Sequence, residues 1–105
     1  MTPFEIFVTC ISWGSSGKNR PVLVLLLSGD NVFVYPITTQ YENKSEVIRM
    51  RYFKINDLEQ AGLVKQSYID TGMLIKLPLS VIANKEAIGQ LSLADKLRLL
   101  EFLSK

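Results

Sequence analysis

The residues best suited to chemistry are Lys18, Arg20, Thr38 and Thr39. Their ammonium, guanidinium and hydroxyl groups are typical ligands of a phosphate, which Arg holds with two parallel hydrogen bonds. The chain of 105 residues contains no His and one Cys. This composition excludes Ser-His-Asp and Cys-His nucleophiles and His-anchored zinc. Any chemistry must therefore use Arg, Lys, carboxylates, hydroxyls or the backbone.

A predicted hairpin brings these residues together. The apolar run over residues 21–28 is typical of a strand that is buried on both faces, and residues 31–38 form the predicted return strand. Between them, Gly29-Asp30 predicts a type II′ turn, in which Gly supplies the positive φ. Because the two strands run antiparallel, residues that precede the first strand lie beside those that end the second.

The register of this hairpin decides which residues meet. With Gly29-Asp30 as the turn, Arg20 faces Thr39, whereas a slip of the turn by one residue places Arg20 opposite Tyr41. Either register puts Arg20 beside Thr38 at one rim of the sheet, which predicts an anion site there. The competing interpretation is that Arg20 is solvated or pairs with a carboxylate, as Arg at strand ends commonly does.

The segment between Trp13 and Arg20 adds to this predicted site. Residues 14–17 predict a Gly/Ser loop whose free backbone N–H groups suit a phosphate. Trp13 either stacks on a nucleic-acid base or fills the core at a strand end. The candidate nucleic-acid contacts are Trp13, Ser15, Ser16, Lys18, Thr39 and Gln40.

The rest of the chain predicts several short strands. They cover residues 4–13, 46–53, 63–64 and 73–77. In the second of these, Arg49 and Arg51 share one face, which is either a track for a nucleic-acid backbone or an ordinary solvated face. Cys10 lies in an apolar strand without a basic neighbour in sequence, which is typical of an inert residue.

Two helices are predicted. Asn56 caps a short one over residues 57–61 that Gly62 ends. Ser92 and Asp95 resemble a capping box that opens a C-terminal amphipathic helix. The predicted core-facing stripe of this helix consists of Leu93, Leu97, Leu100, Phe102 and Leu103.

These elements predict a single domain over residues 1–105 of mainly β, α+β class. We expect a small curled sheet or barrel with a short helical turn and a C-terminal amphipathic helix. The longest apolar run, residues 21–27, is too short to span a bilayer, and the first residues lack the pattern of a signal peptide. We therefore expect a cytoplasmic protein without membrane association. The net charge of +2 does not by itself indicate nucleic-acid binding.

Several stretches together resemble the PemK/MazF toxins of type II toxin–antitoxin systems. The resemblance begins with Lys18-Asn19-Arg20-Pro21 and continues in Val34-Tyr35-Pro36-Ile37-Thr38-Thr39-Gln40. It extends through Gly62-Leu63-Val64-Lys65-Gln66-Ser67-Tyr68-Ile69, Met73-Leu74-Ile75-Lys76-Leu77 and Ile88-Gly89-Gln90-Leu91-Ser92. The match runs from about residue 5 to residue 103, and the motifs occur in the family's order.

This resemblance implies a fold, an activity and partners. Members of the family are compact SH3-like barrels, usually homodimers, and many are metal-independent endoribonucleases that cut single-stranded mRNA at short sequences. Arg20 and Thr38 correspond to the two catalytic positions, no metal or cofactor is expected, and an antitoxin covers the RNA groove. In this chain the segment 14–19 before Arg20 contains no carboxylate, where some relatives place an acid near the catalytic Arg.

Two alternatives remain beside the nuclease hypothesis. One is a non-enzymatic toxin similar to the CcdB toxins, which act on DNA gyrase through the end of the C-terminal helix; the ending Phe102-Leu103-Ser104-Lys105 lacks that signature. The other is a degenerate family member that only binds a partner.

Overall fold

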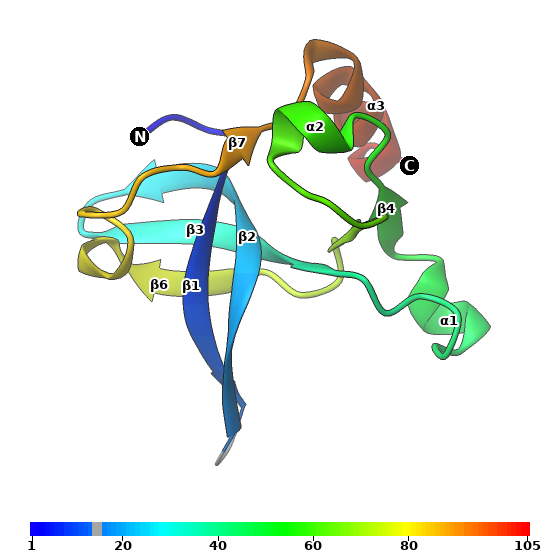
Figure 1. The fold of residues 1–105 in the computed structure, drawn as a ribbon, viewed down its shortest axis with the longest axis horizontal. Helices are drawn as coiled ribbons and strands as arrows, with labels where there is room; N and C mark the ends of the chain where they lie inside the picture. Colours follow the sequence, from blue (N-terminus) through cyan, green and yellow to red (C-terminus); the bar gives the residue numbers. More distant parts are fainter. Residues whose placement is uncertain (14–15) are drawn as a thin grey trace.

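The computed structural model describes residues 1–13 and 16–105, and Figure 1 shows their arrangement. The predicted contact Ser15 lies outside the described residues, as do the side chains of Trp13 and Ser16. The structure is mainly β, and its antiparallel strands form one curled sheet that resembles half a barrel. The C-terminal helix and the two short α-helices lie toward one side of this sheet (Figure 1), so the predicted fold class is confirmed.

The sheet has the strand order β4-β5-β3-β2-β1-β7, and β6 pairs with β3 on the edge opposite β2. Its long strands are β1 (Glu5–Trp13), β2 (Ser16–Ser28) and β3 (Asn31–Thr38). The short strands are β4 (Tyr52–Lys54), β5 (Tyr68–Asp70), β6 (Ile75–Pro78) and β7 (Gly89–Gln90). The strand predicted over residues 63–64 is absent, because the backbone there closes the end of a helix with a hydrogen bond from Leu63 N to Leu58 O.

Strand β2 begins earlier than predicted, and the hairpin that it forms with β1 extends away from the rest of the sheet (Figure 1). The predicted loop over residues 14–17 is wrong at Ser16 and Gly17, which pair with Trp13 and Ser12 of β1. Arg20 lies farther along the same ladder, opposite Thr9. The strand therefore carries Lys18 and Arg20 on a regular backbone instead of at the end of a loop.

The turn between β2 and β3 has the predicted form. Gly29 has φ of +60°, and Ser28 pairs with Asn31 across the turn, so the register with Gly29-Asp30 in the turn is confirmed here. A β-bulge at Leu25 then shifts the pairing by one residue, and Val22 faces Pro36. The predicted pairing of Arg20 with Thr39 is therefore wrong, and the shifted register brings Arg20 toward the level of Thr38.

Hydrophobic side chains pack on both faces of the central strands, as predicted for the first half of the apolar run. Leu23 belongs to one buried cluster with Ile6 and Leu99, whereas Val22 and Val24 belong to another on the opposite face. Beyond the bulge the prediction is wrong, because Leu26 and Leu27 are exposed.

The strand predicted over residues 46–53 is wrong in its first half. Residues Glu46–Arg49 form the short helix α1, and only Tyr52–Lys54 form a strand, β4. Ser45 starts the helix, because its side-chain oxygen accepts a hydrogen bond from Ile48 N at 3.3 Å. Arg49 and Arg51 therefore do not share a strand face.

Helix α2 (Leu58–Ala61) confirms the predicted short helix, although Asp57 replaces Asn56 as its cap. Gly62 ends it with φ of +76°. A further single turn, the 3₁₀ helix η1, covers Leu79–Val81. None of the helices among the described residues is long and apolar enough to cross a membrane.

The C-terminal helix α3 (Leu93–Leu103) begins at the predicted cap, where the Ser92 hydroxyl accepts from Asp95 N at 3.1 Å. The predicted core-facing stripe is mostly wrong. Asp95 and Leu99 are buried and Phe102 packs against the core, whereas the opposite face is exposed. That exposed face carries Leu93, Leu97, Leu100 and Leu103.

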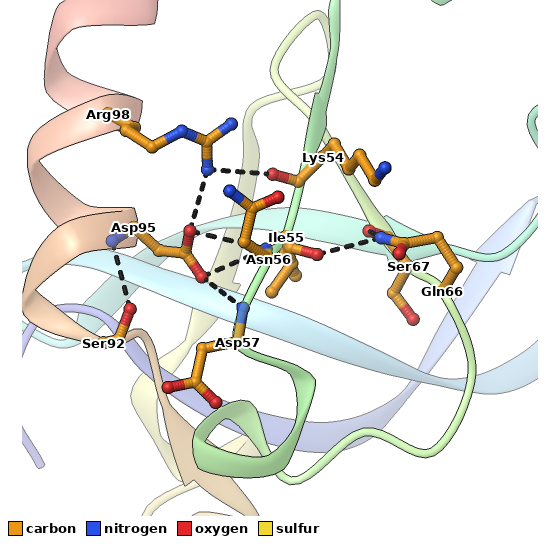
Figure 2. A network of polar contacts seen from close by, with 9 residues as sticks. All are labelled: Lys54, Ile55, Asn56, Asp57, Gln66, Ser67, Ser92, Asp95 and Arg98. Carbon is orange, nitrogen blue, oxygen red and sulfur yellow. Dashed lines mark hydrogen bonds and ion pairs between the residues drawn. The ribbon is translucent and has the colours of Figure 1, made fainter.

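The buried carboxylate of Asp95 ties α3 to the rest of the molecule (Figure 2). It accepts hydrogen bonds from the backbone N–H groups of Asn56 and Asp57 at 3.2 and 2.9 Å. It also pairs with Arg98 Nη1 at 2.8 Å. Because Asp95 is only 1% exposed, these donors replace the water that the carboxylate loses on burial.

Candidate functional site

A cavity of about 250 Å³ opens where β2, β3, β4 and β5 meet α1. Its polar lining contains three cations and one carboxylate. The lining residues are Arg20, Pro36, Thr38, Gln40, Lys44, Ile48, Arg51, Tyr52, Asp70 and Met73. The predicted catalytic residues Arg20 and Thr38 thus line one cavity, together with the predicted contact Gln40.

A second cavity of about 320 Å³ shares Arg20, Thr38 and Gln40 with the first. It also contains the predicted contacts Lys18 and Thr39. The two hollows therefore adjoin at Arg20, Thr38 and Gln40, and we call their combined lining along β2 and the end of β3 the rim. All the predicted contacts with described side chains line this rim.

Thr38 stands at the end of β3, where it pairs with Tyr68 of β5. Its hydroxyl oxygen accepts a hydrogen bond from Gln40 N at 3.0 Å, which holds the side chain at the strand end. A threonine hydroxyl that accepts one bond still has its own proton to donate. Thr38 and Arg20 are both half-buried, so a ligand between them would be partly removed from water.

Arg51 enters the cavity from the turn between α1 and β4. Its Nε atom pairs with Asp70 Oδ1 at 3.1 Å, and the Asp70 side chain is only 8% exposed. Asp70 also accepts from Gly72 N at 3.0 Å. The structure therefore provides a carboxylate in the Arg20 cavity from β5, although the segment before Arg20 contains none.

Three tyrosines support this side of the cavity. The rings of Tyr41 and Tyr68 stack with centroids 4.3 Å apart, and Tyr52 lies within 6.4 Å of both. The guanidinium of Arg49 lies over the Tyr41 ring at 5.5 Å. Arg49 therefore holds α1 against the segment after β3. It does not form the predicted nucleic-acid track with Arg51.

Tyr52 lines the cavity itself. Burial, and then the negative charge of Asp70, raise the pKa of its phenol above 10.0, against the opposing effects of Arg51 and Arg20. Tyr52 is therefore neutral at physiological pH. In this state its hydroxyl can donate a hydrogen bond to an anion.

The cavity is suited to an anion. It contains three positive charges, from Arg20, Lys44 and Arg51, against the single negative charge of Asp70. Two hydroxyl donors are added by Thr38 and Tyr52. Guanidinium and hydroxyl groups around a small hollow match the oxygens of a phosphate. Among the described residues, no group of three His, Cys, Asp or Glu is placed to hold a metal ion.

Sequence reasoning missed Lys44, Arg51, Tyr52 and Asp70 as members of this cavity. Arg51 and Asp70 are nineteen positions apart, and no local pattern joins them. One signal in the sequence points to the correct arrangement. Ser45 followed by Glu46 is typical of the start of a helix, and a helix there would place Arg49 and Arg51 in different elements instead of on one strand face.

No protein-family model matches the chain, and no curated protein is significantly similar to it in sequence.

Proposed function

We propose that this protein is an endoribonuclease that cuts single-stranded RNA without a metal ion, in the manner of a PemK/MazF-like toxin. The observation that carries the proposal is the shared cavity of Arg20 and Thr38 at the rim of the curled sheet. The sequence motifs around both residues support the same function. We further propose that it acts in the cytoplasm on mRNA.

RNA supplies the nucleophile that this chain lacks. In the proposed reaction, the 2′-oxygen bonds to the adjacent phosphorus while its proton passes to solvent. The bond from phosphorus to the 5′-oxygen breaks, and the departing oxygen takes up a proton. The products are a 2′,3′-cyclic phosphate and a 5′-hydroxyl, and neither a metal nor an imidazole is required.

Arg20 and Thr38 have separate roles in this mechanism. The guanidinium of Arg20 stabilises the negative charge that grows on the non-bridging oxygens, because its positive charge and its N–H donors face those oxygens. The hydroxyl of Thr38 donates to the same phosphate and holds it in line for attack. Arg20 can also supply the proton to the 5′-oxygen, whereas a role as general base does not fit its chemistry.

The proposal is tested by incubating the purified protein with a mixture of cellular RNAs in EDTA. The wild type is expected to cut, and Arg20→Ala is expected to lose about 10²- to 10³-fold in rate with its fold intact. Lys76→Ala is the matched control, because Lys76 is exposed on β6 and lines neither cavity. A wild type that cuts no RNA would refute the proposal.

We also propose a homodimer and an antitoxin as partners. The exposed leucines of α3 lie opposite its buried face, and a leucine stripe is self-complementary in a two-fold helix pair. Leu97→Glu is expected to convert the dimer to a monomer in light scattering. A wild type that is monomeric at micromolar concentration would contradict the proposed homodimer.

The proposed antitoxin would bind at the cationic rim, which suits an acidic segment of that partner.

The same leucine face favours a second candidate function, a toxin that binds a protein such as DNA gyrase. The two functions differ in the residues that toxicity needs. Toxicity that survives Arg20→Ala but is lost in Leu97→Glu would favour the protein target. Toxicity that is lost in Arg20→Ala supports the nuclease.

A further inference from the structure

Arg51 is held by both its backbone and its side chain. Its carbonyl oxygen accepts hydrogen bonds from Thr71 N at 3.0 Å and from Thr71 Oγ1 at 2.7 Å. Its Nε atom donates to Asp70 Oδ1 at 3.1 Å. These contacts fix the start of the side chain and the plane of the guanidinium.

Gly72 provides the space in which this side chain lies. A Cβ atom on Gly72 would stand 2.2 Å from Arg51 Cδ and 2.6 Å from Arg51 Nε. The backbone of Gly72 also donates to Asp70 Oδ1 at 3.0 Å, so one oxygen receives both groups. Any larger residue at this position would push Arg51 away from Asp70.

The pair differs from an ordinary surface ion pair in its position and in its spare donors. Asp70 is nearly buried, whereas the Arg51 side chain is 40% exposed and lines the same cavity as Arg20. A guanidinium has five N–H donors, and within the described residues the side chain of Arg51 uses one of them. An anchored guanidinium with donors to spare is prepared for an anion before the anion arrives.

We propose that Arg51 is a second phosphate-binding residue of this cavity and that Asp70 and Gly72 are its positioning residues. This inference rests on the proposed function, since it assigns Arg51 to a phosphate of the same RNA strand next to the one held by Arg20. Single-stranded RNA repeats its phosphates along the chain, so one cation cannot fix its direction. Two guanidinium groups in one hollow hold both phosphates and thereby set the scissile bond over Thr38.

The test measures the binding of an uncleavable 2′-O-methyl RNA oligonucleotide by fluorescence anisotropy over a series of salt concentrations. Arg51→Met is expected to weaken binding about tenfold and to reduce the slope of log K against log salt by about 0.7, the contribution of one phosphate contact. Arg51→Lys is expected to restore the slope but only part of the affinity. Lys76→Met is the control and should change neither value.

Asp70→Asn gives the sharpest discrimination. This substitution removes a negative charge from a cationic cavity, so charge alone predicts tighter RNA binding. The positioning role predicts weaker binding, by about three- to tenfold, because Arg51 loses its anchor. Gly72→Ala changes no charge and is expected to weaken binding in the same direction.

Each outcome decides the inference. Unchanged binding in Arg51→Met, or tighter binding in Asp70→Asn, overturns it even if Arg20→Met still weakens binding, and the proposed nuclease then stands without it. A wild type that binds no RNA overturns both. Circular dichroism and thermal melting of each variant verify folding, and the Arg51→Lys and Gly72→Ala variants keep the test valid if Asp70→Asn fails to fold.

Discussion

Two buried aspartates in this protein each pair with one arginine, and their surroundings give them different roles. Asp95 receives two backbone N–H groups and Arg98 at the joint between α3 and the segment after β4 (Figure 2). Asp70 receives one backbone N–H and Arg51 at the edge of a cationic cavity. Arg98 also lines a hollow of about 250 Å³, between β4 and α3, so a hollow beside an ion pair does not by itself indicate a function. What distinguishes the Arg51 pair is that its cavity also contains Arg20 and Thr38.

The largest expected effect concerns the Asp95 joint. Asp95→Ala is expected to lower the free energy of unfolding by about 3 kcal/mol, because it leaves buried N–H donors without an acceptor. Urea denaturation measures this loss. Cleavage per folded molecule should stay at the wild-type level. A loss of cleavage in a fully folded variant would contradict this prediction, because it would show that the Asp95 contacts also affect the Arg20 cavity.

The next effect concerns the cavity. Asp70→Asn is expected to slow RNA cleavage about tenfold, the equivalent of about 1.4 kcal/mol, because Arg51 is no longer oriented. The measurement is a single-turnover rate at saturating protein. Its loss of stability should be smaller than that of Asp95→Ala, since Asn keeps an oxygen that can accept from Gly72 N, whereas Ala leaves the N–H groups of Asn56 and Asp57 without an acceptor. The reverse order of the two stability losses would contradict the comparison.

A smaller effect separates the two arginines. Arg98→Met removes one donor from the buried Asp95 carboxylate but leaves its two backbone N–H donors, so it is expected to lower the free energy of unfolding by less than Asp95→Ala, by about 1 kcal/mol. RNA binding should not change, whereas Arg51→Met weakens it. Equal effects of both variants on RNA binding would mean that only net charge matters.

The smallest effect concerns Tyr52, whose pKa is raised by burial and by Asp70. The folded protein holds this proton more tightly than the unfolded chain, so stability falls as the pH rises above 10.0 and through the folded pKa. Tyr52→Phe is expected to make this alkaline fall less steep. Urea denaturation between pH 9 and 11 measures it, and an unchanged pH dependence in Tyr52→Phe would contradict the assignment.

The parts of the fold set by local sequence could be predicted. The turn at Gly29 depends only on the positive φ of that residue and on its immediate neighbours. The start of α3 depends only on the hydrogen bond from Asp95 N to the Ser92 hydroxyl, three positions away. The meeting of Arg20 and Thr38 follows from that turn, although the bulge at Leu25 changes its register. No local pattern predicts this bulge.

The wrong predictions arise where distant contacts decide the outcome. On α3 the leucines suggest a buried face, but the buried Asp95 finds its partners at Asn56 and Asp57, nearly forty positions away. The helix therefore turns its other face inward. Arg51 and Asp70 could not be predicted for the same reason, since the pairing of β4 with β5 that brings them together joins residues far apart in sequence.

The proposed function requires that Arg20 and Thr38 promote attack by the RNA's own 2′-hydroxyl. Mass spectrometry of the ends of RNA fragments cut in EDTA tests it most directly. We predict fragments that end in a 2′,3′-cyclic phosphate and begin with a 5′-hydroxyl, and none from Arg20→Ala. Fragments that carry a 3′-hydroxyl and a 5′-phosphate, or an Arg20→Ala variant that cuts as fast as the wild type, would contradict it.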